Sequence, residues 1–203
     1  MFKRWFIIIA ALGLAGLAAL LWLWHGAPSA SVPQSSADSD FVLQSASGPV
    51  DTVSLRGKVV LVFFGYTFCP DICPTSLAAA TEALNRLNAD ELAQVRLIFI
   101  SVDPERDTLT HLEEYVDFFH PNMIGVTGSA EELAAVAKRY GAAYIRQDVS
   151  GAAGYVIDHS AWTYLLAPDG HMAAKLPHGA AVEQIAAEIR KYLPSTPSSK
   201  GAS

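Results

Sequence analysis

The sequence has only two cysteines among its 203 residues, and they lie four positions apart as Cys69 and Cys73 in the segment FCPDICP. It therefore lacks the C-x-x-C spacing of a thioredoxin-type redox dithiol, which counts against a thiol–disulfide oxidoreductase without excluding one. Only Met123 and Met172 follow the initial methionine, so no cluster of thioethers is present to capture a metal. Two cysteines this close indicate a disulfide, a redox pair or a metal site.

Basic residues are also scarce, because 14 Lys and Arg stand against 20 Asp and Glu, for a formal net charge of −6. Two of the basic residues, Lys3 and Arg4, lie at the N-terminus, so 12 remain against 20 acidic residues and the rest of the chain carries −8. This balance argues against nucleic acid as a partner.

Charge is absent from Trp5 to Trp24, a run of 20 largely apolar residues. At about 1.5 Å per residue, a helix of this length spans a hydrocarbon core of about 30 Å. Lys3 and Arg4 precede it, which keeps the N-terminus cytoplasmic and sends the rest outward. Trp22, Trp24 and His25 stand where a signal-peptide cleavage site needs small residues, so residues 1–25 are predicted to be an uncleaved transmembrane anchor rather than a cleaved signal peptide.

The remaining chain divides by composition. Residues 26–40 are rich in Ser, Ala and Pro and are predicted to be a flexible tether, and residues 194–203 a disordered tail. One domain, residues 41–193, lies between them.

Strands and helices alternate within this domain. The patterns predict a hairpin (41–45 and 50–55), strands at 58–64, 95–102 and 123–127, helices at 75–88 and 109–119, a helix between the capping pair Ser129 and Glu132 and the stop at Gly141, a hairpin at 155–176 and a final helix at 182–193. This order indicates an α/β fold in which a mixed central sheet is flanked by helices and the antiparallel strands come last.

The cysteines follow the apolar strand 58–64 and precede a helix, with Pro74 and Thr75 at its entry. Ligands bind at this edge of an open α/β sheet, and a helix N-terminus lowers the pKa of a thiol. A four-residue offset places two side chains on one face of a helical segment, so both thiolates could bind one ion. Thiolates suit a soft ion such as Cu(I), and most metals need a third ligand.

His159 is the best candidate for that ligand among six histidines. It lies beside Asp158 in YVIDHSAWTYLL, where a polar pair interrupts two apolar β-type segments. It is either a histidine satisfied within a strand bulge or the third ligand of a Cys2His site. The others lie in the tether, on or after a surface helix, after the APDG turn or before the last helix: His25, His111, His120, His171 and His178.

Four features together, GKVVLVFFGYTFCPDICPTSL, SVDPERDT, YVIDHSAWTYLLAPDG and the N-terminal anchor, resemble the Sco/SenC family over residues 41–193. The resemblance implies a thioredoxin-like fold and a membrane-tethered copper-binding protein. It also implies delivery of copper to the binuclear copper centre of cytochrome c oxidase subunit II, or reduction of the cysteines of that subunit. The family's copper ligands fall on Cys69, Cys73 and His159, and the aspartate between its cysteines falls on Asp71.

The expected function is therefore a copper chaperone rather than an enzyme. It would bind one copper ion, Cu(I) and/or Cu(II), on the periplasmic side of a bacterial inner membrane and would need a copper donor, a copper acceptor and a thiol reductant. Asp71 and Asp158 are candidates for contacts behind the ligands. In SVDPERDT, Asp103 and Asp107 are expected to be caps and turn formers before the helix at 109–119.

Three alternatives use the same residues. The first is thiol–disulfide chemistry in the periplasm, either by a reductase, for which His159 would be unnecessary, or by a redox sensor, which would use the same three residues as the chaperone. The second is a catalytic zinc site, for which no general base is evident. A peroxidase of the peroxiredoxin type would have Thr three residues before its cysteine, where this chain has Tyr66 and Pro70.

Overall fold

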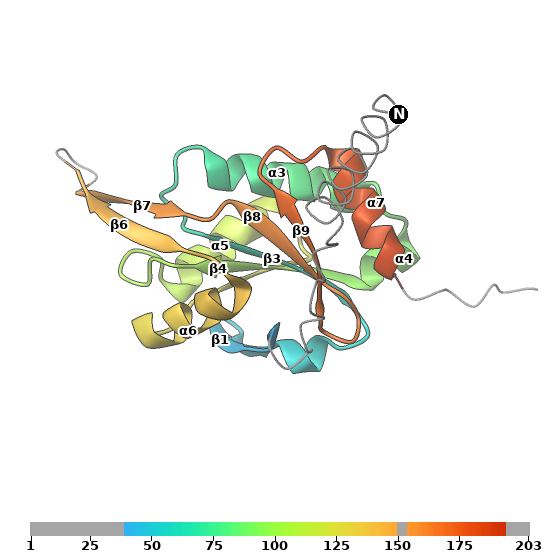
Figure 1. Ribbon diagram of the computed structural model, residues 1–203, viewed down its shortest axis with the longest axis horizontal. Helices are drawn as coiled ribbons and strands as arrows, with labels where there is room; N and C mark the ends of the chain where they lie inside the picture. Colours follow the sequence, from blue (N-terminus) through green and yellow to red (C-terminus); the bar gives the residue numbers. More distant parts are fainter. Residues whose placement is uncertain (1–38, 150–153, 194–203) are drawn as a thin grey trace, which may run out of the picture. The chain divides into compact units, whose positions relative to one another are not determined.

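The computed structural model describes residues 39–149 and 154–193, and a five-stranded sheet forms the centre of this part (Figure 1). The strand order is β5–β4–β3–β8–β9. β3, β4 and β5 are parallel, whereas β8 and β9 run antiparallel to their neighbours, so the predicted mixed sheet is confirmed. The strands are β3 (Val59–Gly65), β4 (Val95–Ser101), β5 (Met123–Val126), β8 (Trp162–Leu166) and β9 (Met172–Pro177).

The central strand β3 is buried along its whole length, which explains its unbroken apolar sequence VVLVFFG. Successive side chains of a strand point to opposite faces of the sheet. One set of β3 side chains, which includes Leu61 and Phe63, packs into one hydrophobic cluster, and the other set, which includes Val62 and Phe64, packs into a second. Both faces of the sheet are therefore covered.

Helices cover the two faces unequally (Figure 1). The first cluster contains residues of α3 (Ile72–Asn85), α5 (Leu109–Phe119) and α7 (Val182–Tyr192). The second contains residues of α6 (Ala130–Tyr140) and of β1 (Val42–Ser45). A short helix, α4 (Ala89–Ala93), lies between α3 and β4.

The predicted ends of α6 are confirmed. Ser129 and Glu132 form a reciprocal capping box at its start, and Gly141 at its end has a φ of 61°, in the left-handed region.

The hairpin predicted at 155–176 is partly wrong. Its first half is a separate strand, β7 (Tyr155–His159), which pairs antiparallel with β6 (Tyr144–Asp148) and not with the central sheet. Only β8 and β9 form the predicted hairpin around APDG. β6 was missed because its sequence YIRQD has no apolar alternation and four of its five residues are exposed.

Two other boundaries differ from the prediction. Helix α3 begins at Ile72 rather than at residue 75, so it includes Cys73. The second strand of the N-terminal hairpin, β2 (Gly48–Asp51), is followed by a 3-10 helix at Thr52–Leu55, where the Asp51 carboxylate accepts from the Val53 N–H.

The predicted anchor, the tail and residues 26–38 of the predicted tether lie outside the described residues. Within residues 39–149 and 154–193, none of the helices has the length and apolar character needed to cross a membrane.

Candidate metal centre

Both cysteines lie where strand β3 is followed by helix α3. β3 ends at Gly65, and in the turn that follows the Cys69 N–H donates to the Tyr66 carbonyl at 3.2 Å. Cys69 is partly exposed in this turn, whereas Cys73, in the first turn of α3, is fully buried. The thiols therefore lie at the C-terminal edge of the parallel strands and beside a helix N-terminus, as the sequence predicted.

Gly65 leaves room for the buried thiol. A Cβ atom at this position would lie 2.5 Å from Sγ of Cys73 and 2.9 Å from Cε2 of Phe99. Both distances are too short for a real contact, so Cys73 packs directly against the backbone of β3. Only glycine at the end of the strand allows the thiol to occupy this position.

His159 is the last residue of β7 and faces the cysteines. Its Nε2 lies 3.3 Å from Sγ of Cys73, and its Nδ1 lies 3.3 Å from the carbonyl oxygen of Ser160. The rings of Phe63 and Tyr66 meet the imidazole edge-on, with centroid distances of 6.1 and 5.9 Å. A neutral imidazole carries one proton: on Nε2 it can donate to a thiolate, and on Nδ1 it can donate to the Ser160 carbonyl, which leaves the Nε2 lone pair available to a metal.

The structure thus brings the three predicted ligands together from distant parts of the chain. The Sγ atoms of Cys69 and Cys73 and a ring nitrogen of His159 all lie within 4.8 Å of one another. Two sulfurs and an imidazole nitrogen are a donor set that suits Cu(I) or Zn²⁺ far better than a hard ion. Of the two interpretations of His159, the geometry favours the ligand.

The two thiols differ in acidity. The pKa of Cys69 is lowered, chiefly because the thiol of Cys73 donates to its sulfur and secondly because His159 does, although burial opposes the shift. The Cys73 N–H also points at this sulfur, at 3.5 Å. The pKa of Cys73 is raised because it is the donor of the pair and because it is buried. Cys69 is therefore the more acidic thiol of the metal-free pair.

The two aspartates proposed to support the ligands lie at the rim of the site. Asp71 precedes the first residue of α3 and is exposed, and its backbone carbonyl accepts from the Thr75 hydroxyl at 2.7 Å. Asp158 is exposed on β7 and neighbours His159 in the strand, so the two side chains alternate to opposite faces.

Three other histidines have polar partners other than the cysteines. Nε2 of His111 lies 3.0 Å from Oγ1 of Thr67, and Nδ1 of His178 lies 2.8 Å from Oγ of Ser76. His171 is paired with Asp169 at 2.6 Å.

The expectation for Asp103 and Asp107 holds in part. The Asp103 carbonyl accepts from the N–H groups of Arg106 and Asp107 and so forms a turn, but neither carboxylate caps helix α5. Thr108 caps the helix by accepting from the His111 N–H. Asp103 and Asp107 are buried, with 2% and 0% of their surface exposed, and their carboxylates bind groups in other segments. Asp103, two residues after the buried strand β4, was a signal in the sequence that could have indicated a buried role.

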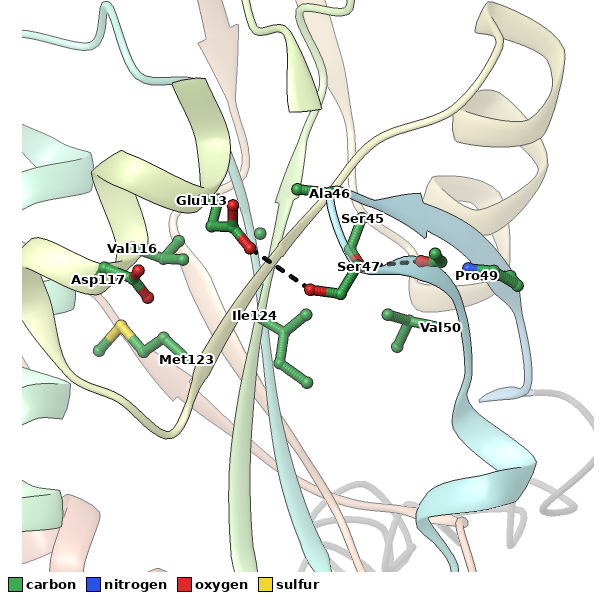
Figure 2. A pocket seen from close by; sticks show the side chains of 12 residues that line it. Ser45, Ala46, Ser47, Pro49, Val50, Glu113, Val116, Asp117, Met123 and Ile124 are labelled. Atoms are coloured by element: carbon green, nitrogen blue, oxygen red, sulfur yellow. Dashed lines mark hydrogen bonds between the residues drawn. The ribbon is translucent and has the colours of Figure 1, made fainter. Parts of the chain in front are cut away.

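A cavity of about 340 Å³ lies elsewhere, beside the edge strand β5 and between α5 and the β1–β2 turn (Figure 2). The carboxylates of Glu113 and Asp117 and the side chains of Ser47, Met123 and Ile124 line it. None of the predicted site residues contributes to it, so the chemistry is concentrated at the cysteine pair.

Comparison with known proteins agrees with the geometry. The SCO1/SenC family profile matches residues 29–194, which include both cysteines and His159. This chain belongs to the SCO1/SenC family. Its similarity to solved Sco structures also confirms the thioredoxin-like α/β fold of the family.

Two solved Sco structures with copper bound are similar to this chain. ScoI of Bradyrhizobium japonicum is 37% identical with a TM-score of 0.69, and the match covers 76% of this chain and 98% of that one. ScoI of Arabidopsis thaliana is 35% identical with a TM-score of 0.70, over 76% and 96% of the two chains. The mitochondrial Sco2 homologue of Bos taurus is 39% identical over 156 residues, which are 76% of this chain and 59% of that protein. The match therefore spans somewhat over half the length of this curated relative.

Proposed function

We propose that this Sco protein binds one copper ion through Cys69, Cys73 and His159 and delivers it to a copper site of cytochrome c oxidase. The observation that carries the proposal is the convergence of the three ligand atoms within 4.8 Å. The similarity to Sco structures with copper bound supports copper over zinc.

The protonation of the pair prepares the site for a soft cation. Cys69 offers a thiolate at once, because its pKa is lowered. Binding then expels the proton of Cys73, since a thiolate, and not a thiol, is the ligand. Two thiolates and one imidazole suit Cu(I), and Cu(II) with an added oxygen ligand.

The unequal burial of the ligands suits transfer. Cys73 is fully buried, whereas Cys69 and His159 are only partly so. An acceptor thiol can therefore approach the ion from the side of Cys69 and replace the ligands one at a time. The acceptor that we propose is the binuclear copper centre of cytochrome c oxidase subunit II. Residues 1–25 would hold the domain at the periplasmic face of the inner membrane, and residues 26–40 would let it reach that centre.

A second function, reduction of cysteines in that subunit, is favoured by one observation. A thiolate at a partly exposed position, with a buried thiol beside it, is the arrangement of an attacking and a resolving cysteine. Oxidation to a disulfide would remove both sulfur ligands, so the redox state would also control copper binding.

The test is a copper titration of the full-length protein, reduced and then freed of reductant. Cys69→Ala, Cys73→Ala and His159→Ala should each weaken Cu(I) binding by at least about tenfold, measured against a competing chelator, while the far-ultraviolet circular dichroism stays unchanged. His171→Ala, at an exposed turn, is the matched control and should bind as the parent does. Full copper affinity in His159→Ala would refute the three-ligand site.

A second experiment distinguishes copper transfer to subunit II from reduction of its cysteines. The copper-loaded protein is mixed with reduced, metal-free subunit II, and the metal-free dithiol is mixed with oxidised subunit II. Two equivalents of the Cu(I)-loaded protein are used in the first mixture, and ferricyanide then removes one electron; appearance of the absorption of a mixed-valence binuclear copper centre supports delivery. Loss of the subunit's disulfide in the second, without any copper transfer in the first, would reassign the protein as a reductase.

A further inference from the structure

The loop between β4 and α5, residues 102–108, contains two buried carboxylates that copper binding does not use. Asp103 is 2% exposed and Asp107 is 0% exposed. A buried carboxylate is costly unless hydrogen bonds compensate for its lost hydration. The partners of these two groups therefore show what the loop stabilises.

Asp107 binds the turn that carries the cysteines. Its Oδ1 accepts from the hydroxyl of Thr67 at 2.5 Å and its Oδ2 from the Thr67 N–H at 3.0 Å. Oδ2 also accepts from the hydroxyl of Ser101, the last residue of β4, at 2.5 Å. Thr67 lies two residues before Cys69, so one buried group fixes the turn by a backbone and a side-chain bond.

Asp103 binds the strand that carries His159. Its Oδ1 accepts from the hydroxyl of Tyr155 at 2.7 Å, and its Oδ2 accepts from Nε of Arg106 at 2.5 Å. Arg106 in turn donates through Nη1 to the Tyr155 carbonyl at 3.1 Å, and its guanidinium lies 3.6 Å from the centre of the Tyr155 ring. Tyr155 is the first residue of β7 and His159 is the last.

These contacts are important because the β6–β7 sheet forms no ladder with the central sheet. An isolated two-stranded hairpin is at best marginally stable, so the orientation of this one depends on side-chain contacts. One further contact comes from the cysteine side, where the Ile157 N–H donates to the hydroxyl of Tyr66 at 3.3 Å. The position of His159 relative to the thiols therefore depends on the hydrogen bonds from the loop, together with the packing of Ile157 in the second cluster and the two-residue link from β7 to β8.

We propose that loop 102–108 is the positioning element of the copper site, with Asp107 holding the thiol half and Asp103 with Arg106 holding the histidine half. The proposal rests on the proposed function for its purpose, but its geometric content does not depend on copper. It also explains why the segment SVDPERDT carries two aspartates and an arginine.

The proposal requires the two halves to be separable by mutation. Thr67→Val removes a bond to Asp107 with little change in volume, and Asp107→Asn removes the charge. Tyr155→Phe removes the bond to Asp103, and Arg106→Lys removes the guanidinium that bridges Asp103 and the Tyr155 carbonyl. Asp117→Asn, on the exposed surface of α5, is the control for all four.

The thiol half is measured in the full-length, copper-free protein by equilibration with glutathione. Oxidised glutathione takes two electrons from the pair, so Cys69 and Cys73 form a disulfide while the glutathione S–S bond breaks. Of the two glutathione sulfurs released, one takes the proton of Cys73 and the other a proton from solvent. A disulfide needs its two sulfurs about 2.05 Å apart, so the cysteine turn must move to form it. A loosened turn can make this movement more easily. Thr67→Val and Asp107→Asn should therefore shift this equilibrium about tenfold toward the disulfide, while Tyr155→Phe and Arg106→Lys should change it less than twofold.

The histidine half is measured by the imidazole resonances of His159 in the copper-free protein and by the Cu(II) electron paramagnetic resonance spectrum. Tyr155→Phe and Arg106→Lys should shift or broaden the imidazole resonances and alter the Cu(II) spectrum. Both variants should also weaken copper binding about tenfold. Asp117→Asn should change neither half.

The proposal is overturned if the four variants leave both readouts at parental values, or if each variant changes both readouts in proportion to its loss of thermal stability. A protein that binds no copper would defeat the proposed function alone, since the glutathione equilibrium and the imidazole resonances would still decide the role of the loop.

Discussion

Strand β3 and the β6–β7 hairpin meet at the metal centre but differ in their packing. All seven residues of β3 are buried, and the strand is paired on both sides, with β4 and β8. Four of the five residues of β6 are exposed, and β6 and β7 pair only with each other. The thiols thus follow a strand that is paired on both sides, and the imidazole lies on a two-stranded sheet outside the central one. The thiols are therefore positioned mainly by strand pairing, whereas His159 is positioned by side-chain contacts of β7.

The largest loss of stability that tests this contrast is expected for a substitution inside the central sheet. Phe63 is 1% exposed and packs against Phe99, so Phe63→Ala should lower the free energy of unfolding by about 3–5 kcal/mol. Urea denaturation of the reduced, metal-free protein measures it. A loss below about 1 kcal/mol would mean that β3 is not the rigid half.

The next effect concerns the acidity of Cys69. An ordinary thiol has a pKa of about 8.5, so the fraction present as thiolate falls about 80-fold between pH 8 and pH 6. The pKa of Cys69 is lowered, so its thiolate persists as the pH falls through this window. Alkylation by iodoacetamide should therefore be nearly as fast at pH 6 as at pH 8, with Cys69 modified before the buried Cys73. An 80-fold fall in rate would contradict the assigned shift.

A smaller effect is expected where the strand meets the buried thiol. Gly65→Ala places a methyl group 2.5 Å from Sγ of Cys73, which should cost about 1–3 kcal/mol of stability. Thermal or urea unfolding measures the loss. The double variant with Cys73→Ala removes the sulfur and should recover part of this cost. Gly65→Ala is made in the parent and in Cys73→Ala, and the two losses of stability are compared. Equal losses in the two backgrounds would show that the sulfur is not the obstacle.

The smallest effect is expected on the hairpin. Ile145 lies on β6 opposite Asp158 and is 59% exposed, so Ile145→Ala should change the free energy of unfolding by no more than about 0.5 kcal/mol. Copper affinity should stay within about threefold. A loss as large as that of Phe63→Ala, in the same urea titration, would remove the contrast between the two regions.

The sequence predicted strand β3 better than the β6–β7 hairpin. The continuous apolar run of β3 and the capping pair of α6 are local signals, and both identified their elements correctly. β6 has no such signal, since its stability depends on pairing with β7. The division of YVIDHSAWTYLL between two sheets was missed for the same reason, because both halves have a strand-like pattern.

The site residues show the same limit of prediction from local sequence signals. Cys69 and Cys73 were found by their spacing, and His159 by its interruption of an apolar pattern and by the family resemblance. The role of Asp107 depends on a contact with Thr67, 40 residues away in the chain. Sequence spacing carries no information on such a contact, so a local role as a cap was the natural but incorrect prediction.

The separation of the ligands along the chain also sets the order in which they are synthesised. Cys73 and His159 are 86 residues apart. At about 5–20 residues per second, a ribosome adds the histidine roughly 4–17 seconds after the second cysteine. Throughout that interval the nascent chain carries a complete dithiol and no imidazole. Any ion captured then would have two ligands only, so the three-ligand site is necessarily loaded after β7 has been synthesised and folded.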